Sequence, residues 1–130
     1  MITIREISDE QAKYGMQKGE FGRELTHSNT YVAVVLTQDW CAQWSAVQQW
    51  LRDLNKRREP HDLDIDVYQL VYNKKEYFDQ FLRFKEDVLG NFLIPYIRYY
   101  GDGRLIGETN YVSMEEFIAR FRRAAGSADG

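Results

Sequence analysis

The single cysteine of this sequence lies where an apolar strand is expected to meet a helix. Residues 31–37, Tyr-Val-Ala-Val-Val-Leu-Thr, form an almost uninterrupted apolar run, typical of a central strand covered on both faces. The run leads through Asp39 and Trp40 to Cys41, at about which a helix is expected to begin. Unpaired backbone N–H groups and the positive end of the helix dipole both stabilise a thiolate at that position. The position therefore favours an accessible sulfur over an inert core cysteine.

A second motif is the pair Ile94-Pro95, near the start of a later predicted strand. Proline has no N–H to donate to a strand ladder, so it belongs at strand starts or sheet edges. The local sequence alone favours an ordinary trans bond here, because only about one X–Pro bond in twenty is cis.

The elements that must position these residues alternate between strand and helix patterns. Residues 2–7 alternate as a half-exposed strand does, and Ser8 with Gln11 forms a capping box that begins a helix. Glycines 19 and 22 allow that helical region to divide into two short helices. The helix after Cys41 carries apolar residues at spacings of three and four: Trp44, Val47, Leu51 and Leu54.

The second half of the chain continues this alternation and ends in a hairpin. Residues 65–72 are predicted as a third strand and residues 74–89 as a helix. The segment 92–100 and the segment from Arg104 are predicted as two strands joined by an Asp-Gly turn. A last helix begins with the capping pattern of Ser113 and Glu116.

This order predicts an α/β fold, a three-layer sandwich around a mixed, mainly parallel sheet with a C-terminal β-hairpin and helix. We expect one domain over residues 1–123 and a flexible tail over residues 124–130, which have no large apolar side chain.

Composition excludes several classes of function. A formal charge of −3 argues against nucleic-acid binding, and the basic runs at 56–58 and 120–123 are interpreted as helix C-termini. No apolar run is long enough to span a membrane, and the N-terminus lacks the apolar stretch of a signal peptide, so a cytoplasmic location is expected. One cysteine forms no internal disulfide, and two distant histidines make no metal site, so neither metal nor cofactor is expected.

The sequence resembles the thioredoxin family over essentially its whole length, from Ile2 to about Phe121. Asp39-Trp40-Cys41-x-x-Trp44 is similar to the family's Trp-Cys-x-x-Cys region, and the pair Ile94-Pro95 to its Ile–cis-Pro element. The hairpin and the terminal helix then follow in the family's order.

The resemblance implies a role for each of these positions. Cys41 would match the nucleophilic cysteine, with Trp40 as the flanking indole. Pro95 would be cis and face Cys41, and the backbone of Ile94 would pair with an extended substrate segment.

The departures from the family pattern concern the same reaction. The family's resolving cysteine is replaced by Trp44, and its buried acid by Val35, so that no second thiolate is present to release a mixed disulfide. The glycine often found at the end of the last strand aligns with Tyr111. An ordinary dithiol reductase is therefore not expected.

Two functions remain open at this point. In the first, Cys41 performs monothiol thiol–disulfide exchange with a protein or low-molecular-weight thiol, and an external thiol resolves the mixed disulfide. In the second, the protein is a non-catalytic interaction module whose groove grips a partner with Trp40, Trp44 and Tyr96. For Trp44, packing onto the core competes equally with a contact role. A third, weaker possibility is a dimer linked through Cys41, and the sequence does not indicate the oligomeric state.

Overall fold

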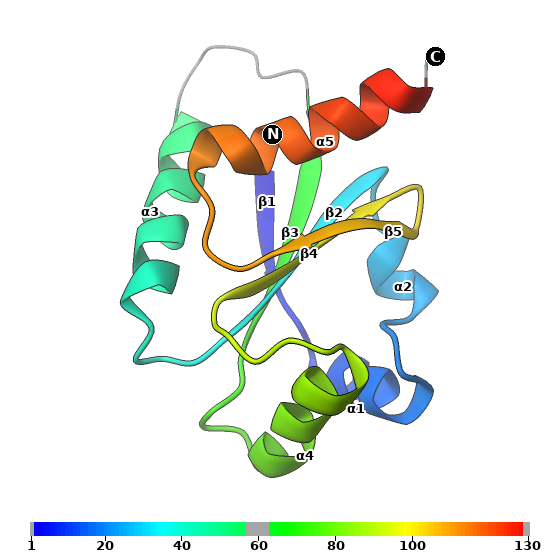
Figure 1. Cartoon of the computed structure of the whole chain (residues 1–130), viewed down its shortest axis with the longest axis vertical. Coiled ribbons are helices and arrows are strands. Elements are labelled where there is room, and N and C mark those ends of the chain that lie inside the picture. Colours follow the sequence, from blue (N-terminus) through cyan, green and yellow to red (C-terminus); the bar gives the residue numbers. More distant parts are fainter. Residues whose placement is uncertain (1, 57–62, 129–130) are drawn as a thin grey trace.

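A five-stranded mixed sheet forms the centre of the computed structural model, with helices on both of its faces (Figure 1). The structure describes residues 2–56 and 63–128. The sheet order is β1-β3-β2-β4-β5. β1 (Ile2–Glu6), β3 (Ile65–Val71) and β2 (Tyr31–Thr37) run parallel, whereas β4 (Tyr96–Gly101) and β5 (Arg104–Thr109) pair antiparallel. This is the predicted α/β sandwich.

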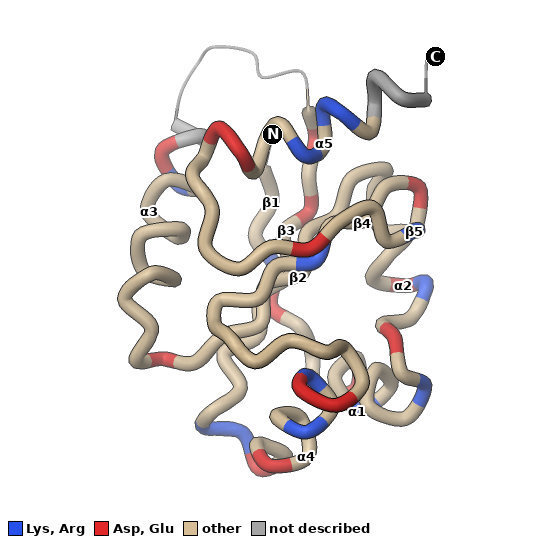
Figure 2. Tube along the Cα trace, viewed as in Figure 1, with Lys and Arg blue, Asp and Glu red and all other residues tan. Residues whose placement is uncertain are grey.

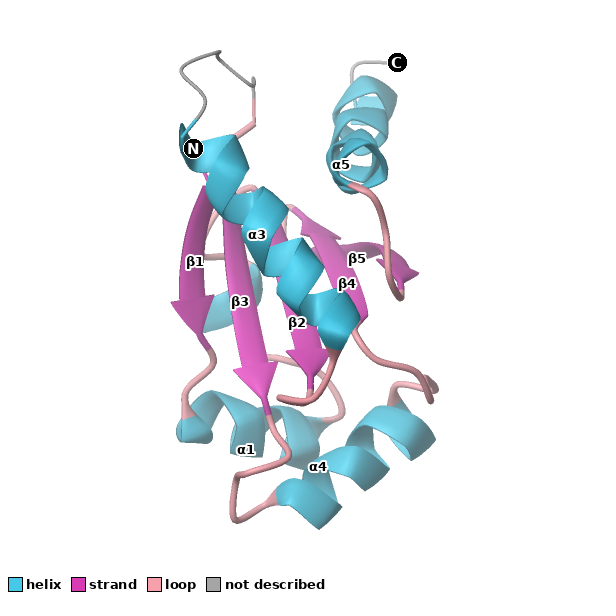
Figure 3. Cartoon of the chain, turned by 90° about the vertical axis from the view of Figure 1, so that its left-hand side faces the viewer, coloured by secondary structure: helices cyan, strands magenta, loops and turns pink. Residues whose placement is uncertain are grey.

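Two helices cover one face of the sheet. They are α3 (Ala42–Lys56), which crosses the sheet in Figure 3, and α5 (Met114–Ala128). Their apolar stripes pack on inward side chains of β2, β3 and β4, and the aromatic contacts include Tyr99 with Phe117 and Phe121. The helical spacing in the sequence correctly predicts that Trp44, Val47 and Leu51 lie on this face, while the side chain of Leu54 lies outside the described ones.

The opposite face is covered by α1 (Asp9–Lys18), α2 (Arg23–Thr26) and α4 (Phe78–Arg83), which runs into a π-helical turn, η1 (Phe84–Val88). The capping box of Ser8 and Gln11 is present at the start of α1 with both of its hydrogen bonds. The region divides into two helices after Gly19, whose φ of 81° ends α1 in a left-handed cap.

Three predicted element bounds differ from the structure by more than one residue. The helix expected from residue 74 begins only at Phe78, because residues 74–77 form turns. The strand expected from residue 92 begins at Tyr96, so Ile94-Pro95 lies in the preceding loop. α5 continues to Ala128, so most of the segment expected as a tail is helical, and residues 129–130 lie outside the described residues.

The basic runs also need a correction. Arg120 and Arg123 lie within α5 and not at its end, and both pair with Glu116, over 3.0 and 2.8 Å. They are surface ion-pair partners, spaced at one and two helical turns. The other basic run belongs largely to residues outside the described ranges.

Candidate functional site

The loop that carries the cysteine is anchored to the segment that follows β3. Two hydrogen bonds join Asp39 and Asn73: the backbone N–H of Asp39 donates to Asn73 Oδ1 over 3.0 Å, and Asn73 Nδ2 donates to the carboxylate oxygen Oδ1 of Asp39 over 2.7 Å. The Lys74 ammonium lies 3.0 Å from Asp39 Oδ2, and this bond is the main reason that the pKa of Asp39 lies below its usual value. The loop is therefore held at the end of the parallel strands.

Trp40 lies on the surface of this loop. The residue is 68% exposed, and its Nε1–H donates to Gln38 Oε1 over 2.7 Å. Gln38 in turn donates to the Tyr72 hydroxyl over 3.3 Å. The indole is thus oriented by a hydrogen bond and remains open to a partner.

Cys41 immediately precedes α3, as the sequence predicts, but its side chain is only 5% exposed. Its Sγ accepts the Trp44 N–H over 3.3 Å, and its carbonyl accepts the Ser45 N–H over 3.3 Å. The sulfur thus takes the place of a helix-capping side chain, which turns it toward the first helical turn and into the apolar cluster beneath α3. The expectation of an accessible thiol is wrong for this structure.

Trp44 belongs to the core. It is 4% exposed and packs in the same apolar cluster as Val47 and Leu51, and its indole N–H has no acceptor among the described residues. Tyr96, the other aromatic residue expected to grip a partner, is fully buried. The contact roles expected of both rings are therefore wrong: Trp44 packs in the apolar cluster beneath α3, and Tyr96 packs in the cluster on the opposite face of the sheet.

The Ile94–Pro95 peptide bond is cis in the structure. Pro95 is buried, and Tyr96, which follows it, pairs with Leu36 of β2. Ile94 packs on the apolar cluster that contains Cys41 and Trp44. The fold thus brings the cysteine loop and the proline loop to the same end of the sheet.

The proline loop carries two exposed apolar side chains that the sequence analysis missed. Phe92 and Leu93 are 70% and 63% exposed. The sequence predicts a strand from residue 92, whereas β4 begins at Tyr96 and leaves both side chains in the loop before it. With Trp40, these two residues form a set that we call the exposed apolar trio.

Comparison with known proteins shows what this arrangement resembles. No protein-family profile and no curated protein sequence matches the chain. Among solved structures, thioredoxin f2 of Chlamydomonas reinhardtii superposes with a TM-score of 0.63 at 16% identity, covering 93% of this chain and 95% of that one. Spinach chloroplast thioredoxin f in its long form gives 0.60 at 13% identity, covering 95% and 87%. The chain has the thioredoxin fold.

Thioredoxin O1 of Arabidopsis thaliana in its oxidized state agrees equally well, with a TM-score of 0.61 at 12% identity over 94% of this chain and 96% of that chain. Identities this low establish the thioredoxin fold and nothing finer. Within that fold, Cys41 is the one cysteine of the sequence, and Val35, in the position expected for the family's acid, is fully buried in β2.

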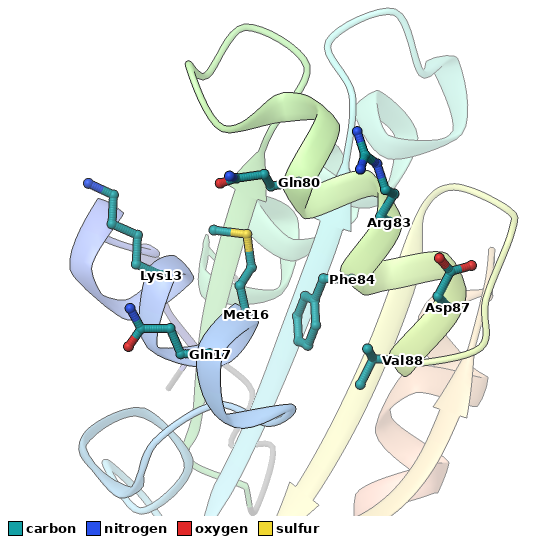
Figure 4. Close-up of a pocket in the computed structure, with 8 residues that line it drawn as sticks. All are labelled: Lys13, Met16, Gln17, Gln80, Arg83, Phe84, Asp87 and Val88. Atoms are coloured by element: carbon teal, nitrogen blue, oxygen red, sulfur yellow. The ribbon is translucent and has the colours of Figure 1, made fainter.

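A hollow of about 590 Å³ lies on the other face of the thioredoxin fold, between α1 and the α4–η1 segment. Met16 and Phe84 form its apolar floor, while Lys13 and Arg83 extend from opposite sides (Figure 4). Its charged groups do not converge on one point, so it lacks the focused polar contacts of a small-molecule site.

Charged residues of both signs occur on α1, on α4 with η1 and on α5, whereas most of α3 carries none (Figure 2). Within the described ranges there is no group of three or more side chains suited to hold a metal ion. No helix in the described part of the chain has the length and apolar character needed to cross a membrane.

Proposed function

We propose that this thioredoxin-fold protein is a non-catalytic interaction module that binds an extended polypeptide segment beside the exposed apolar trio. The observation that carries the proposal is the exposure of Trp40, Phe92 and Leu93 on two loops at one end of the sheet. Large exposed apolar groups mark interaction surfaces, and aromatic side chains are frequent binding anchors.

The backbone of Ile94 supports the choice of an extended segment as the ligand. Neither its N–H nor its C=O has a hydrogen-bond partner among the described residues, whereas the carbonyls of Leu93 and Pro95 on either side both bond to Asn110. Backbone groups left open next to a sheet can pair with an added strand. Ile94 would supply these main-chain bonds, and the apolar trio would supply side-chain contacts.

Binding of this kind does not need the sulfur. Cys41 is covered, and with Trp44 in place of a second cysteine no thiol of this chain can resolve a mixed disulfide. The role of Cys41 in the proposal is to begin α3 beneath the binding surface.

Selection of random peptides on the immobilised protein tests the proposal. Peptides enriched on the wild-type protein should bind the Cys41→Ser variant with a dissociation constant within about twofold. The double variant Phe92→Ser/Leu93→Ser should weaken binding at least roughly tenfold, since it removes two anchors. Val88→Ser is the matched control, because Val88 is also exposed but lies on η1. Equal binding by the double variant, or complete loss in Cys41→Ser, would overturn the proposal.

Monothiol exchange is the second candidate, favoured by the Sγ···H–N contact with Trp44 at the start of α3. The Cys41 thiolate would attack a disulfide of a protein or low-molecular-weight partner, and the departing sulfur would leave as a thiolate. An external thiol would then attack the mixed disulfide and restore the Cys41 thiolate. Oxidised glutathione followed by intact-mass measurement tests this: exchange predicts one glutathione adduct on the folded protein and none on Cys41→Ser. A folded wild-type protein that stays unmodified would exclude it.

Both candidates suit a reducing compartment, and we propose the cytoplasm as the location. A single thiol forms no internal disulfide that an oxidising compartment would preserve.

A further inference from the structure

We infer that Lys85, Asn91 and Asn110 form a polar clamp that positions the 91–95 loop, and that protonation of Lys85 regulates how firmly this loop is held. The inference deepens the proposed function, because it rests on this loop being a binding surface. The three residues come from three different parts of the chain: η1, the proline loop and the turn after β5.

Lys85 supplies the buried end of the clamp. Its side chain is only 1% exposed, although the residue lies on a short helical turn at the molecular surface. Its Nζ donates to the backbone carbonyl of Asn91 over 2.9 Å, lies 3.5 Å from Asn91 Oδ1, and is 5.7 Å from the centre of the Tyr96 ring. No carboxylate among the described residues forms an ion pair with it. The polar contacts of the ammonium group are therefore made to Asn91 of the loop.

Asn91 and Asn110 connect Lys85 to the backbone of Leu93 and Pro95 through side-chain hydrogen bonds. Their side-chain amides face each other, with Nδ2···Oδ1 distances of 3.2 and 3.0 Å. Asn91 Oδ1 also accepts the Leu93 N–H over 3.0 Å. Asn110 Nδ2 lies 3.3 Å from the Leu93 carbonyl and 3.0 Å from the Pro95 carbonyl. The backbone on both sides of Ile94 is thereby fixed, while Ile94 itself is left open.

The charge on Lys85 makes the clamp sensitive to pH. Burial lowers the pKa of Lys85 to about 8, against the smaller opposing effect of Glu86. The other charged or titratable groups on the elements around it are Asp87 of η1, Tyr96 and Arg98 of β4, Glu108 of β5, and Glu20, which pairs with Arg98.

The direction of the effect follows from the burial of Lys85 in the closed structure. When the loop opens, Nζ loses the Asn91 carbonyl and meets water, which returns the pKa of Lys85 toward its ordinary value, so between pH 8 and about 10 the open form binds more protons than the closed form. We expect the loop to open less often at pH 9 than at pH 7, by up to roughly tenfold, because raising the pH favours the form that binds fewer protons.

Limited proteolysis measures this without any binding partner. Chymotrypsin cleavage after Phe92 and Leu93 is followed by mass spectrometry at pH 7 and pH 9, and each rate is divided by that of a free peptide with the sequence of residues 88–97. The wild-type ratio should fall by up to roughly tenfold between the two pH values, because the closed form binds fewer protons than the open one. Lys85→Met should be cleaved rapidly at both, with a flat profile. Lys13→Met, which changes an exposed lysine, should follow the wild type.

Two further measurements keep the inference falsifiable if Lys85→Met fails to fold. Asn110→Ala leaves Lys85 in place and should speed cleavage of the loop at pH 7. In protein labelled with ¹³C at the lysine side chains, one lysine resonance should titrate near pH 8, and this resonance should be missing from Lys85→Met. A pH-independent wild-type ratio, a protected loop in Asn110→Ala, or no lysine titrating near pH 8 would overturn the inference. Failure of peptide binding with a pH-dependent loop would instead contradict the proposed function alone.

Discussion

The Sγ atom of Cys41 accepts a hydrogen bond from the backbone N–H of Trp44, with a sulfur–nitrogen distance of 3.3 Å. This contact ties the one thiol of the chain to the first turn of α3. The same contact covers the sulfur and begins α3, so it bears on both stability and reactivity.

Replacing the acceptor tests the capping role of this sulfur. Cys41→Ala leaves the Trp44 N–H without its acceptor, and we expect the free energy of unfolding to fall by about 1 kcal/mol, as for other caps. Cys41→Ser keeps an oxygen that can accept the Trp44 N–H, so its free energy of unfolding should fall less than that of Cys41→Ala. Urea unfolding of the three proteins at pH 7 compares them. A serine variant less stable than the alanine variant would show that apolar contact, and not capping, is the main role of the sulfur.

Trp44→Cys tests the loop geometry. Removing a buried indole should cost about 3 kcal/mol in the reduced protein. Under mild oxidation the new thiol should form a disulfide with Cys41, because the residue 44 backbone already contacts the sulfur. The intact mass should then be lower by two hydrogens, and a thiol assay should detect no free thiol. Trp44→Ser is the control for lost volume. A monomer that keeps both thiols would contradict the geometry.

Gly103 in the β4–β5 turn allows no side chain. Its φ is +79°, and a Cβ there would lie 2.1 Å from the His27 ring. We expect Gly103→Ala to lower the free energy of unfolding by about 2 kcal/mol, whereas Gly90→Ala, with φ +77° and open space, should cost about 1 kcal/mol from backbone strain alone. His27→Ala should recover part of the difference. Equal losses at both glycines in urea unfolding would contradict the clash.

Buried tyrosines and Lys85 predict a stability maximum at alkaline pH. Burial lowers the pKa of Lys85 to about 8, so between pH 8 and 10 the unfolded chain binds more protons and stability rises with pH. Burial raises the pKa of Tyr99 and Tyr96 to about 12, so above pH 10 the unfolded chain loses protons that the folded one keeps, and stability falls.

Urea midpoints at pH 7, 9 and 11 check both slopes. Lys85→Met should abolish the rise of the urea midpoint between pH 7 and 9, and Tyr99→Phe should reduce its fall between pH 9 and 11. A wild-type midpoint that falls steadily from pH 7 would contradict the burial of the lysine.

The sequence predicted the parts of the fold that depend on local patterns. The apolar run at 31–37 became β2, Ser8 and Gln11 formed the expected capping box, and the Asp-Gly pair made the hairpin turn. In each case short-range hydrogen bonding and burial agree with the tertiary structure.

The candidate site was harder to predict, because exposure depends on neighbours that are distant in sequence. Nothing near Cys41 shows that capping turns its sulfur inward, and Phe92 and Leu93 continue the apolar run of β4 without a break. Lys85 did carry a signal. It lies four residues after Phe81, on the apolar side of its helix, where a lysine must find a buried partner.

Binding of one enriched peptide to the wild type, Cys41→Ser and Phe92→Ser/Leu93→Ser tests the central claim most directly. We predict that the serine variant at position 41 keeps a dissociation constant within about twofold, and that the double variant loses at least roughly tenfold in affinity. Loss of binding in Cys41→Ser with full binding in the double variant would show that the thiol, and not the exposed apolar trio, recognises the partner.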